Sequence, residues 1–388
     1  MKNPRATPTA RPALVLGLMS GTSLDAVDLA LCRVTLDRVE LEAHWQVDFP
    51  AALRRRLSDA ARGGATSWET GQLHHDLGRF YAHAALGVLG RRRPDLVGLH
   101  GQTIYHRPPD RGRRAVASAT FQLGEPAWLA EALRVPVVSN FRAADLAAGG
   151  EGAPLATLFH QVVFAEPGRF VCVNNLGGIS NVTALDARRR GRMRVMAFDT
   201  GPANLPLDLA VRAWSRGRLT CDRDGRGAAR GRVDEARLKR WLRHPFLRCP
   251  PPKSTGREMF GEDFLAPELR RVRPADRERC DLLATLTEFT ARSLAAAYRR
   301  FLHGWPDRVV LAGGGAANPF LVGRISAALE AVGPTEVVTS AALGWPLQAI
   351  EPAAFALLAH YRRQGLPANL PATTGAARAV PLGQVTEP

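Results

Sequence analysis

The chain has 388 residues, of which 46% are hydrophobic and 23% are charged, as in globular proteins large enough for two domains. It contains no run of 18 or more apolar residues, so the sequence predicts neither a membrane-spanning helix nor a membrane partner. The formal net charge of +16 comes almost entirely from arginines spread over the whole chain, and no basic, aromatic-interleaved block accompanies them, which argues against a specific nucleic-acid partner.

The first half of the chain is predicted to begin with strands and to continue with alternating helices and strands. Runs rich in Val, Leu or aromatic residues, bounded by turn residues, predict strands at 13–19, 27–34 and 41–49. Helical patterning follows at about 51–61 and 69–90. The other elements expected in this half are a buried strand at 96–99, a helix at about 124–133 and a strand at 135–138.

The second half repeats this order of elements. Its expected strands are 169–175, 179–185, 193–199, 309–311 and 335–339. Its expected helices are 203–216, 281–302, 318–331 and 349–363. Residues 217–280 are basic and rich in Pro and Gly, and they are predicted to form an insertion.

Each half therefore has the order β-β-β-α-β-α-β, with antiparallel hairpins first and crossover units after them. Three leading strands exclude a simple Rossmann chain and predict an α/β protein with two similar lobes and a ligand cleft between them. We expect the first lobe to comprise residues 1–145, completed by the C-terminal segment 350–388, and the second lobe to comprise 146–349.

Glycine-rich turns at the ends of strands indicate a phosphate-binding protein. They lie at 20–25, 175–180, 199–204 and 312–318. Exposed N–H groups in such turns and at helix N-termini bind phosphate oxygens, and the Walker A and G-x-G-x-x-G patterns are both absent. Two hairpin loops in corresponding positions of two lobes, with a triple glycine between a strand and a helix, predict a nucleotide triphosphate held from both sides.

Asp199 ends an apolar strand beside a glycine turn. A carboxylate there is either a general base, a metal ligand at the mouth of a cleft, or the N-cap of the following helix. His100 also ends a strand, where a histidine is usually a structural hydrogen-bonding group. Glu351 stands near the start of an apolar helix, where the helix dipole alone favours an acidic residue.

Short motifs distributed nearly from end to end carry a family resemblance. They are MSGTSLD (19–25), HGQT (100–103), FQLG (121–124), GGEGAPL (149–155), NLGGISN (175–181), FDTGP (198–202), KSTGRE (253–258) and GGGAANP (313–319). In this order they resemble the anhydro-N-acetylmuramic acid kinases, bacterial sugar kinases of the actin-like, sugar-kinase and Hsp70 ATPase superfamily.

The resemblance implies two ribonuclease-H-like lobes of the actin-like ATPase type, each with a mixed sheet flanked by helices, and an active site in the cleft between them. It implies an enzyme that opens the 1,6-anhydro ring of 1,6-anhydro-N-acetylmuramic acid with water while the γ-phosphoryl group of ATP moves to O6. The product would be N-acetylmuramic acid 6-phosphate, an intermediate of peptidoglycan recycling. The resemblance also implies ATP and Mg²⁺ as cofactors and a homodimer as the assembly.

The resemblance also implies site residues. Asp199 would be the base that deprotonates the attacking water. Thr103, Arg142 and Glu351 would bind the sugar, and Asp25 would assist Mg²⁺ bound through the phosphates. The residues expected to bind ATP and its phosphates are Ser20, Gly21, Thr22, Ser23, Leu24, Asp25, Ala26, Val27, Asp28, Gly177, Gly178, Thr200, Gly201, Gly313, Gly314, Gly315 and Asn318.

Three alanines depart from the family's usual pattern. Ala143 stands where an arginine is expected near the sugar, and Ala26 and Ala203 replace usual glycines. These departures leave open an alternative, an actin-like-fold kinase that acts on a different sugar or anhydro sugar. A further alternative is a nucleotide-gated binding protein, which would bind nucleic acid in a salt-sensitive way and turn over little sugar.

The five cysteines are an odd number and include no C-x-x-C pair. They therefore indicate neither a disulfide framework nor a zinc ribbon, and they favour a reducing, cytoplasmic location.

Overall fold

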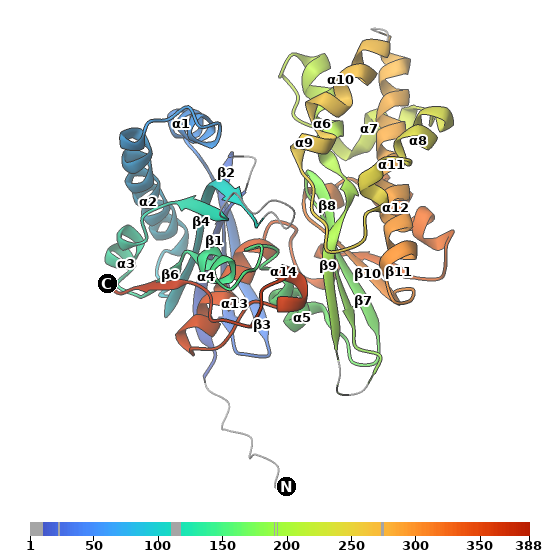
Figure 1. The fold of residues 1–388 in the computed structure, drawn as a ribbon. Helices are drawn as coiled ribbons and strands as arrows, with labels where there is room; N and C mark the ends of the chain where they lie inside the picture. The colour runs from blue at the N-terminus through green and yellow to red at the C-terminus, as the bar shows by residue number, and fades with distance from the viewer. Residues whose placement is uncertain (1–10, 22–23, 110–117, 190, 192, 273–274) are drawn as a thin grey trace. The chain divides into compact units, whose positions relative to one another are not determined.

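The structure, a computed structural model, describes residues 11–21, 24–109, 118–189, 191, 193–272 and 275–388 (Figure 1). The chain forms two compact units. The first contains Met1–Val163 and Ala349–Pro388, and the second contains Phe164–Gln348. Each unit is a mixed β-sheet flanked by helices, which confirms the predicted fold class.

The first unit is built on a sheet with the strand order β12-β6-β4-β1-β2-β3, and β5 pairs with β4. The three leading strands are antiparallel, whereas β4 is parallel to both β1 and β6. The strands are β1 (Ala13–Ser20), β2 (Ala26–Val34), β3 (Val39–Asp48), β4 (Leu96–Arg107), β5 (Ala119–Leu123), β6 (Val137–Ser139) and β12 (Gln384–Thr386). The helices are α1 (Ala51–Ala61), α2 (Ser67–Leu89), α3 (Ala127–Leu133), α4 (Phe141–Ala147), α5 (Thr157–Phe164), α13 (Ile350–Arg363) and α14 (Pro371–Thr374).

Helix α13 packs directly on strands β1, β2 and β4, and two glycines permit this close approach. A Cβ atom added at Gly17 would overlap the carbonyl oxygen of Pro352, and one added at Gly98 would overlap that of Phe355. Only glycine leaves room for a helix backbone this near to a strand. An apolar cluster joins the sheet to α1, α2 and α3. With α13 also packed on the sheet, the unit has the layered core of an α/β protein.

The second unit repeats this plan with the strand order β11-β10-β7-β8-β9. Strands β7, β8 and β9 are antiparallel, and β10 is parallel to β7 and to β11. The strands are β7 (Phe170–Leu176), β8 (Ile179–Asp186), β9 (Arg194–Pro202), β10 (Arg308–Ala312) and β11 (Glu336–Thr339). The helices that frame the sheet are α6 (Asn204–Ser215), α11 (Asp276–Phe301) and α12 (Pro319–Glu330), with the short 3₁₀ turns η3 (Gly314–Ala317) and η4 (Ala341–Leu343).

The predicted insertion is a folded helical region and not an irregular loop. It contains η1 (Arg223–Gly225), α7 (Arg226–Arg230), α8 (Glu235–Trp241), η2 (Pro245–Arg248), α9 (Arg257–Phe260) and α10 (Glu262–Arg271). Trp241, Phe246 and Phe260 join Leu207 and Phe289 in an apolar cluster that attaches the region to α6 and α11. These few large side chains, dispersed among Arg, Pro and Gly, form the core of the region.

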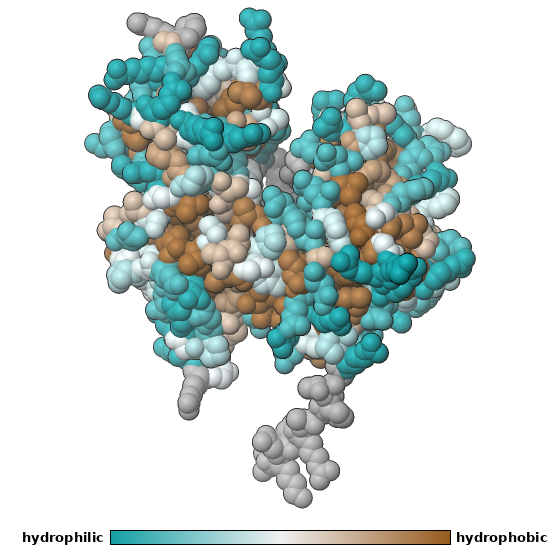
Figure 2. All heavy atoms as spheres, turned by 180° about the vertical axis from the view of Figure 1, so that it is seen from behind, coloured by the Kyte–Doolittle hydropathy of each residue, from teal (hydrophilic) through white to brown (hydrophobic). Residues whose placement is uncertain are grey.

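Hydrophilic side chains cover much of the face shown in Figure 2, with apolar side chains visible between them. Arginines of the second unit form dispersed ion pairs with acidic side chains. Arg230 pairs with Asp276, and Arg257 pairs with Glu262. None of the described helices is long and apolar enough to cross a membrane.

The first boundary between the units lies after Val163, later than the sequence-based expectation of 145. Residues after Asp145 fold back on the first unit, because the Asp145 carboxylate accepts hydrogen bonds from the Gly152 amide at 2.8 Å and from Asn369 at 2.7 Å. The C-terminal segment from Ala349 belongs to the same unit.

Two pairings were not expected from the sequence. Strand β4 continues beyond the buried run to Arg107 and forms a hairpin with β5, and β12 pairs with β6. Both β5 and β12 are short and partly polar, so their patterns are too weak to separate from loops.

Candidate active site

The first glycine loop joins β1 to β2. Within it, Leu24 has a positive φ of 59°, and its amide donates a hydrogen bond to the carbonyl oxygen of Gly21 at 3.3 Å. Gln102, in the motif HGQT on β4, donates a hydrogen bond from its side-chain amide to the same carbonyl oxygen at 3.1 Å. The loop is thus tied to β4. Thr22 and Ser23, which were expected to bind phosphate, lie outside the described residues.

The side chains around this loop point in different directions. Ser20 is buried, and its hydroxyl shares a 2.8 Å hydrogen bond with the hydroxyl of Tyr81 on α2. Ala26 and Val27 are buried strand residues. Asp25 is exposed and lies 3.6 Å from Arg54 in a surface ion pair. Of the described side chains expected in this loop, the Asp25 carboxylate is therefore directed to the surface, and Ser20, Ala26 and Val27 are directed to the core.

In the second unit the turn Gly177–Gly178 lies against the N-terminus of α6. The amides of Ala203 and Asn204 donate to the carbonyls of Gly178 and Gly177, each at 3.0 Å. The side chain of Asn204 also donates to the carbonyl of Leu176 at 3.0 Å. Asn204 was not assigned a role from the sequence, although it ends the predicted loop 199–204.

The triple glycine packs against the same turn. Gly313 has a φ of +76°, and a Cβ atom there would overlap the side-chain oxygen of Asn175. A Cβ atom on Gly315 would lie 2.7 Å from Cβ of Leu176. Asn318 follows and caps α12 by accepting a hydrogen bond from the Leu321 amide at 3.0 Å. The structure therefore brings the predicted residues 177–178 and 313–318 together within one unit.

Strand β9 places Asp199 beside these turns through a change of register. Asn181 pairs with Asp199 but Ser180 pairs with Gly201, so Thr200 is the extra residue of a bulge. The Thr200 hydroxyl is fully buried and donates to the Ser180 hydroxyl at 2.6 Å. The Ser180 hydroxyl also accepts a hydrogen bond from the side-chain amide of Asn174 at 2.8 Å. Thr200 thus stabilises the bulge through its side chain.

The Asp199 carboxylate is held by the segment that contains the motif KSTGRE. The Thr255 amide donates to Oδ2 of Asp199 at 2.8 Å, and the Asp199 amide donates to the carbonyl of Lys253 at 3.1 Å. The motif was noted in the sequence, but no role was assigned to Lys253 or Thr255. Lys253 is one of only three lysines in the chain, and this rarity was the available signal.

In the first unit, Arg142 and His100 form a buried pair. Nε of Arg142 donates to Nε2 of His100 at 3.0 Å, and Nη1 donates to the carbonyl of Gly152 at 2.7 Å. Burial, with the Arg142 charge as a smaller cause, holds the pKa of His100 well below its ordinary value. The imidazole is therefore neutral at pH 7 and accepts from Arg142, which supports the structural interpretation of His100.

Carboxyl groups lie near Arg142 in the same unit. Its guanidinium interacts electrostatically with Glu351 on α13, and Glu351 in turn repels Asp28. Burial raises the pKa of Asp28 to about 6, against the hydrogen bond that Gln46 donates to it at 2.9 Å. Asp28 was expected to bind phosphate, but its electrostatic neighbour is Glu351, a residue expected to bind the sugar.

Thr103 lies on β4 and its hydroxyl accepts a 3.3 Å hydrogen bond from Gln122 of β5. The β4–β5 hairpin, missed from the sequence, therefore fixes the position of this expected sugar-binding residue. Asp145 is another residue that the sequence did not single out. It is fully buried and organises the turn that ends at Gly152, the acceptor of Arg142.

No group of three or more His, Cys, Asp or Glu side chains suited to a metal ion occurs among the described residues.

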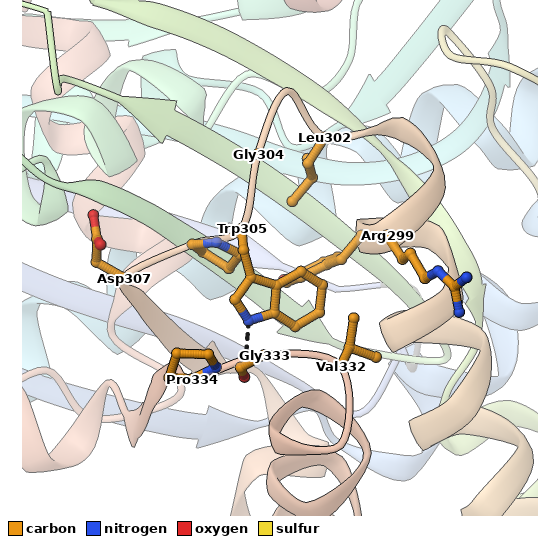
Figure 3. A pocket seen from close by; sticks show the side chains of 10 residues that line it. Arg299, Leu302, Gly304, Trp305, Asp307, Val332, Gly333 and Pro334 are labelled. Atoms are coloured by element: carbon orange, nitrogen blue, oxygen red, sulfur yellow. Dashed lines mark hydrogen bonds between the residues drawn. The ribbon is translucent and has the colours of Figure 1, made fainter.

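A surface pocket of about 470 Å³ lies elsewhere in the second unit (Figure 3). It surrounds Trp305, whose indole nitrogen donates to the carbonyl of Gly333 at 3.0 Å. Arg299, Val332 and Asp307 line its sides. Its lining residues come from 298–307, before β10, and from 332–334, after α12, so the pocket shares no residue with the predicted site.

Known proteins resemble this chain along nearly its whole length. Similar solved structures include a ROK family glucokinase from Streptomyces griseus, at 15% identity and a TM-score of 0.41, over 91% of this chain and 100% of that one. Among curated relatives, an anhydro-N-acetylmuramic acid kinase of Gloeobacter violaceus is 44% identical, over 96% of this chain and 98% of the relative. One of Trichormus variabilis is 40% identical, over 97% and 98%.

The family model described as anhydro-N-acetylmuramic acid kinase matches residues 13–388, which includes both units and every described glycine turn. The departures at Ala143 and Ala203 therefore occur within a full-length match, and the alternative of a kinase for another sugar is not favoured. The chain belongs to the anhydro-N-acetylmuramic acid kinase family and is a kinase enzyme.

Proposed function

We propose that Asp199 is the general base of a reaction in which water opens the anhydro ring and ATP phosphorylates O6. Asp199 takes a proton from water, and the water oxygen forms a bond to the anomeric carbon C1. The C1–O6 bond breaks, its electron pair stays on O6, and O6 attacks the γ-phosphorus as ADP leaves. One proton returns from Asp199 to solvent, so sugar, water and ATP give the 6-phosphate, ADP and a proton.

The observation that carries this role is the 2.8 Å hydrogen bond from the Thr255 amide to Asp199 Oδ2, beside the glycine turns. A base must be fixed within hydrogen-bond reach of the water that it deprotonates. Since O6 is captured by phosphorus as the acetal opens, an acid on the leaving oxygen is not required, unlike in most glycoside hydrolases.

We assign the nucleotide to the glycine turns 177–178 and 313–315 of the second unit, with Asn318 and Gly201 beside them. Backbone N–H groups in such turns stabilise the charge of a transferring phosphoryl group, which needs positioning more than covalent help. We also assign the first loop, residues 20–28 of the first unit, to the phosphates. Asp25 is its exposed carboxylate, and it is the residue that would approach Mg²⁺ bound to the phosphates.

The sugar is assigned to Thr103, Arg142 and Glu351 of the first unit. Two of the Arg142 donors are already used by His100 and Gly152, so the guanidinium is held in one orientation. We further propose a homodimer that works in the cytoplasm, within peptidoglycan recycling. The absence of a C-x-x-C pair and the presence of exposed free thiols at Cys221 and Cys249 are in keeping with a reducing compartment.

Replacing Asp199 with Asn tests the base. General base catalysis contributes about 10²- to 10⁴-fold, so turnover of Asp199→Asn should fall by that factor. Binding of ATP, measured by calorimetry, should remain because the glycine turns are unchanged. Near-normal turnover would remove Asp199 from the base role.

Isotope labelling tests the order of bonds independently of any variant. In ¹⁸O-labelled water, the label should appear at C1 of the sugar phosphate and not in the phosphoryl group. Unlabelled product incubated with labelled water and enzyme measures the exchange background. Label that enters only free phosphate would show that water attacks phosphorus, and the proposed chemistry would then be wrong.

A further inference from the structure

The segment Lys253–Thr255 makes hydrogen bonds to both the side chain and the backbone of Asp199. The Thr255 amide donates to the carboxylate at 2.8 Å, while the carbonyl of Lys253 accepts from the Asp199 amide at 3.1 Å. The segment belongs to no helix or strand, so its position against β9 depends on these two hydrogen bonds and on the contacts of its own side chains.

The Lys253 side chain provides contacts of this kind. Its ammonium lies 4.6 Å from the ring centres of both Phe246 and Phe301, and 6.0 Å from that of Phe198. It also donates a hydrogen bond to the carbonyl of Phe246 at 3.2 Å. Contacts of a cation with ring faces strengthen when both are removed from water, and this site is partly buried. The three rings come from β9, η2 and α11, so one side chain connects three elements.

The charge of Lys253 also acts on Asp199. The two groups attract each other electrostatically, and the other charged or titratable groups near the ammonium are Cys249 and Arg300. Burial lowers the pKa of Lys253 to about 8, so the ammonium is charged at lower pH and loses its charge above about pH 8. Throughout the pH range in which a carboxylate base titrates, Lys253 therefore favours its ionised form.

We propose that Lys253 is a positioning residue for Asp199, because it anchors the segment that orients the carboxylate and because its ammonium stabilises the ionised base. This inference depends on the proposed base role of Asp199. Lys253 acts through Asp199 and through the backbone of its own segment, and the reaction requires no chemical change in it.

Lys253→Met and Lys253→Arg separate this role from simple packing. Methionine keeps an apolar side chain among the three aromatic rings and removes the charge. We therefore expect kcat to fall about tenfold or more, which is less than the full loss expected when the general base itself is removed. The KM for ATP should stay within about twofold. The acid limb of the kcat/KM profile should move to higher pH by roughly half a unit to one unit, because an ionised base loses a nearby opposite charge.

Lys253→Arg keeps the charge and should return the acid limb to its wild-type position. Because arginine does not lose its proton near pH 8, any loss of activity that Lys253 causes above that pH should disappear in this variant. The arginine profile alone thus tests the proposal if the methionine variant fails to fold. Lys239→Met, an exposed lysine on α8, is the matched control and should behave as wild type.

A wild-type kcat and acid limb in Lys253→Met would overturn the proposal. Equal losses of kcat in Lys253→Met and Lys253→Arg, with both acid limbs unchanged, would also overturn it, since packing alone would then explain them. Asp199→Asn keeps the two ideas apart. If that variant stays active, the base role fails; if it is inactive while Lys253→Met is normal, only the inference about Lys253 fails.

Discussion

Single residues in this chain have roles that their identity alone does not reveal. Ser20 and Thr200 lie in predicted phosphate loops, yet both hydroxyls are buried and bonded to Tyr81 and Ser180. A turn rich in hydroxyls thus uses some of them to fix its own backbone. Among the described residues of these two loops, backbone amides are the remaining donors for a phosphate, and their positions depend on the glycines.

Gly313→Ala tests this dependence. The residue has a φ of +76°, and a Cβ atom would overlap the side chain of Asn175, so strain and overlap should together cost about 1–3 kcal/mol of folding free energy. The KM for ATP should rise because the turn must shift. Gly314→Ala is the matched control for stability, since its nearest neighbour would be 4.0 Å away. Chemical denaturation of both variants measures the difference, and equal stability would contradict the assigned strain.

At the scale of elements, the sequence predicted the leading hairpins and crossover units because each is a long apolar run with clear boundaries. Strand β5 was missed, since its register depends on pairing with β4 rather than on its own five residues. The placement of the glycine loops in the sequence led us to expect 177–178 and 313–318 at one site, but it did not reveal the contacts that bring them together. Gly313 is positioned by Asn175, which is far away in the sequence, and periodicity carries no information on such contacts.

The link between α11 and α12 also depends on a contact that the sequence pattern did not indicate. Glu288 on α11 is buried and accepts from Arg292 at 2.6 Å and from Arg324 of α12 at 2.7 Å. These arginines hold the pKa of Glu288 below its ordinary value, so it contributes stability above the unfolded pKa and loses it as the pH falls through the folded value. Helix α12 begins at Pro319, with Asn318 as its N-cap, shortly after the triple glycine 313–315.

Glu288→Gln should therefore loosen α12 at neutral pH. Each arginine is about two-fifths exposed, so solvent screening reduces the expected loss to about 1–2 kcal/mol of unfolding free energy. Glu235→Gln removes an exposed partner of the same Arg292 and should cost less than about 0.5 kcal/mol. Urea denaturation at pH 7 compares the two variants. A Glu235→Gln loss as large as that of Glu288→Gln would refute the assigned importance of burial.

At the scale of the whole molecule, the two units share a plan but differ in their buried titratable groups. The first unit contains His100, His106 and His160, and burial is the main cause that lowers the pKa of each. In the second unit, burial lowers the pKa of one histidine, His244, and raises that of Asp208 to about 6, as it does for Asp28 in the first unit. The units therefore differ mainly in how many histidines have a pKa that burial lowers.

Acidification should weaken the first unit more than the second. His106 and His160 have pKa values of about 4 in the folded chain, against an ordinary value of 6.5, so between these values the unfolded chain binds more protons. Their stabilising contribution is therefore full above pH 6.5 and decreases as the pH falls towards 4. Asp28 and Glu351 oppose this loss, because burial raises their pKa values and so favours the folded state at low pH. They are two groups against five histidines of the unit whose pKa values burial lowers: His44, His100, His106, His160 and His360. Hydrogen exchange at pH 7 and pH 5, corrected for intrinsic rates, should show β4 losing more protection than β7. A larger loss in β7 would mean that the buried histidines do not govern the acid response.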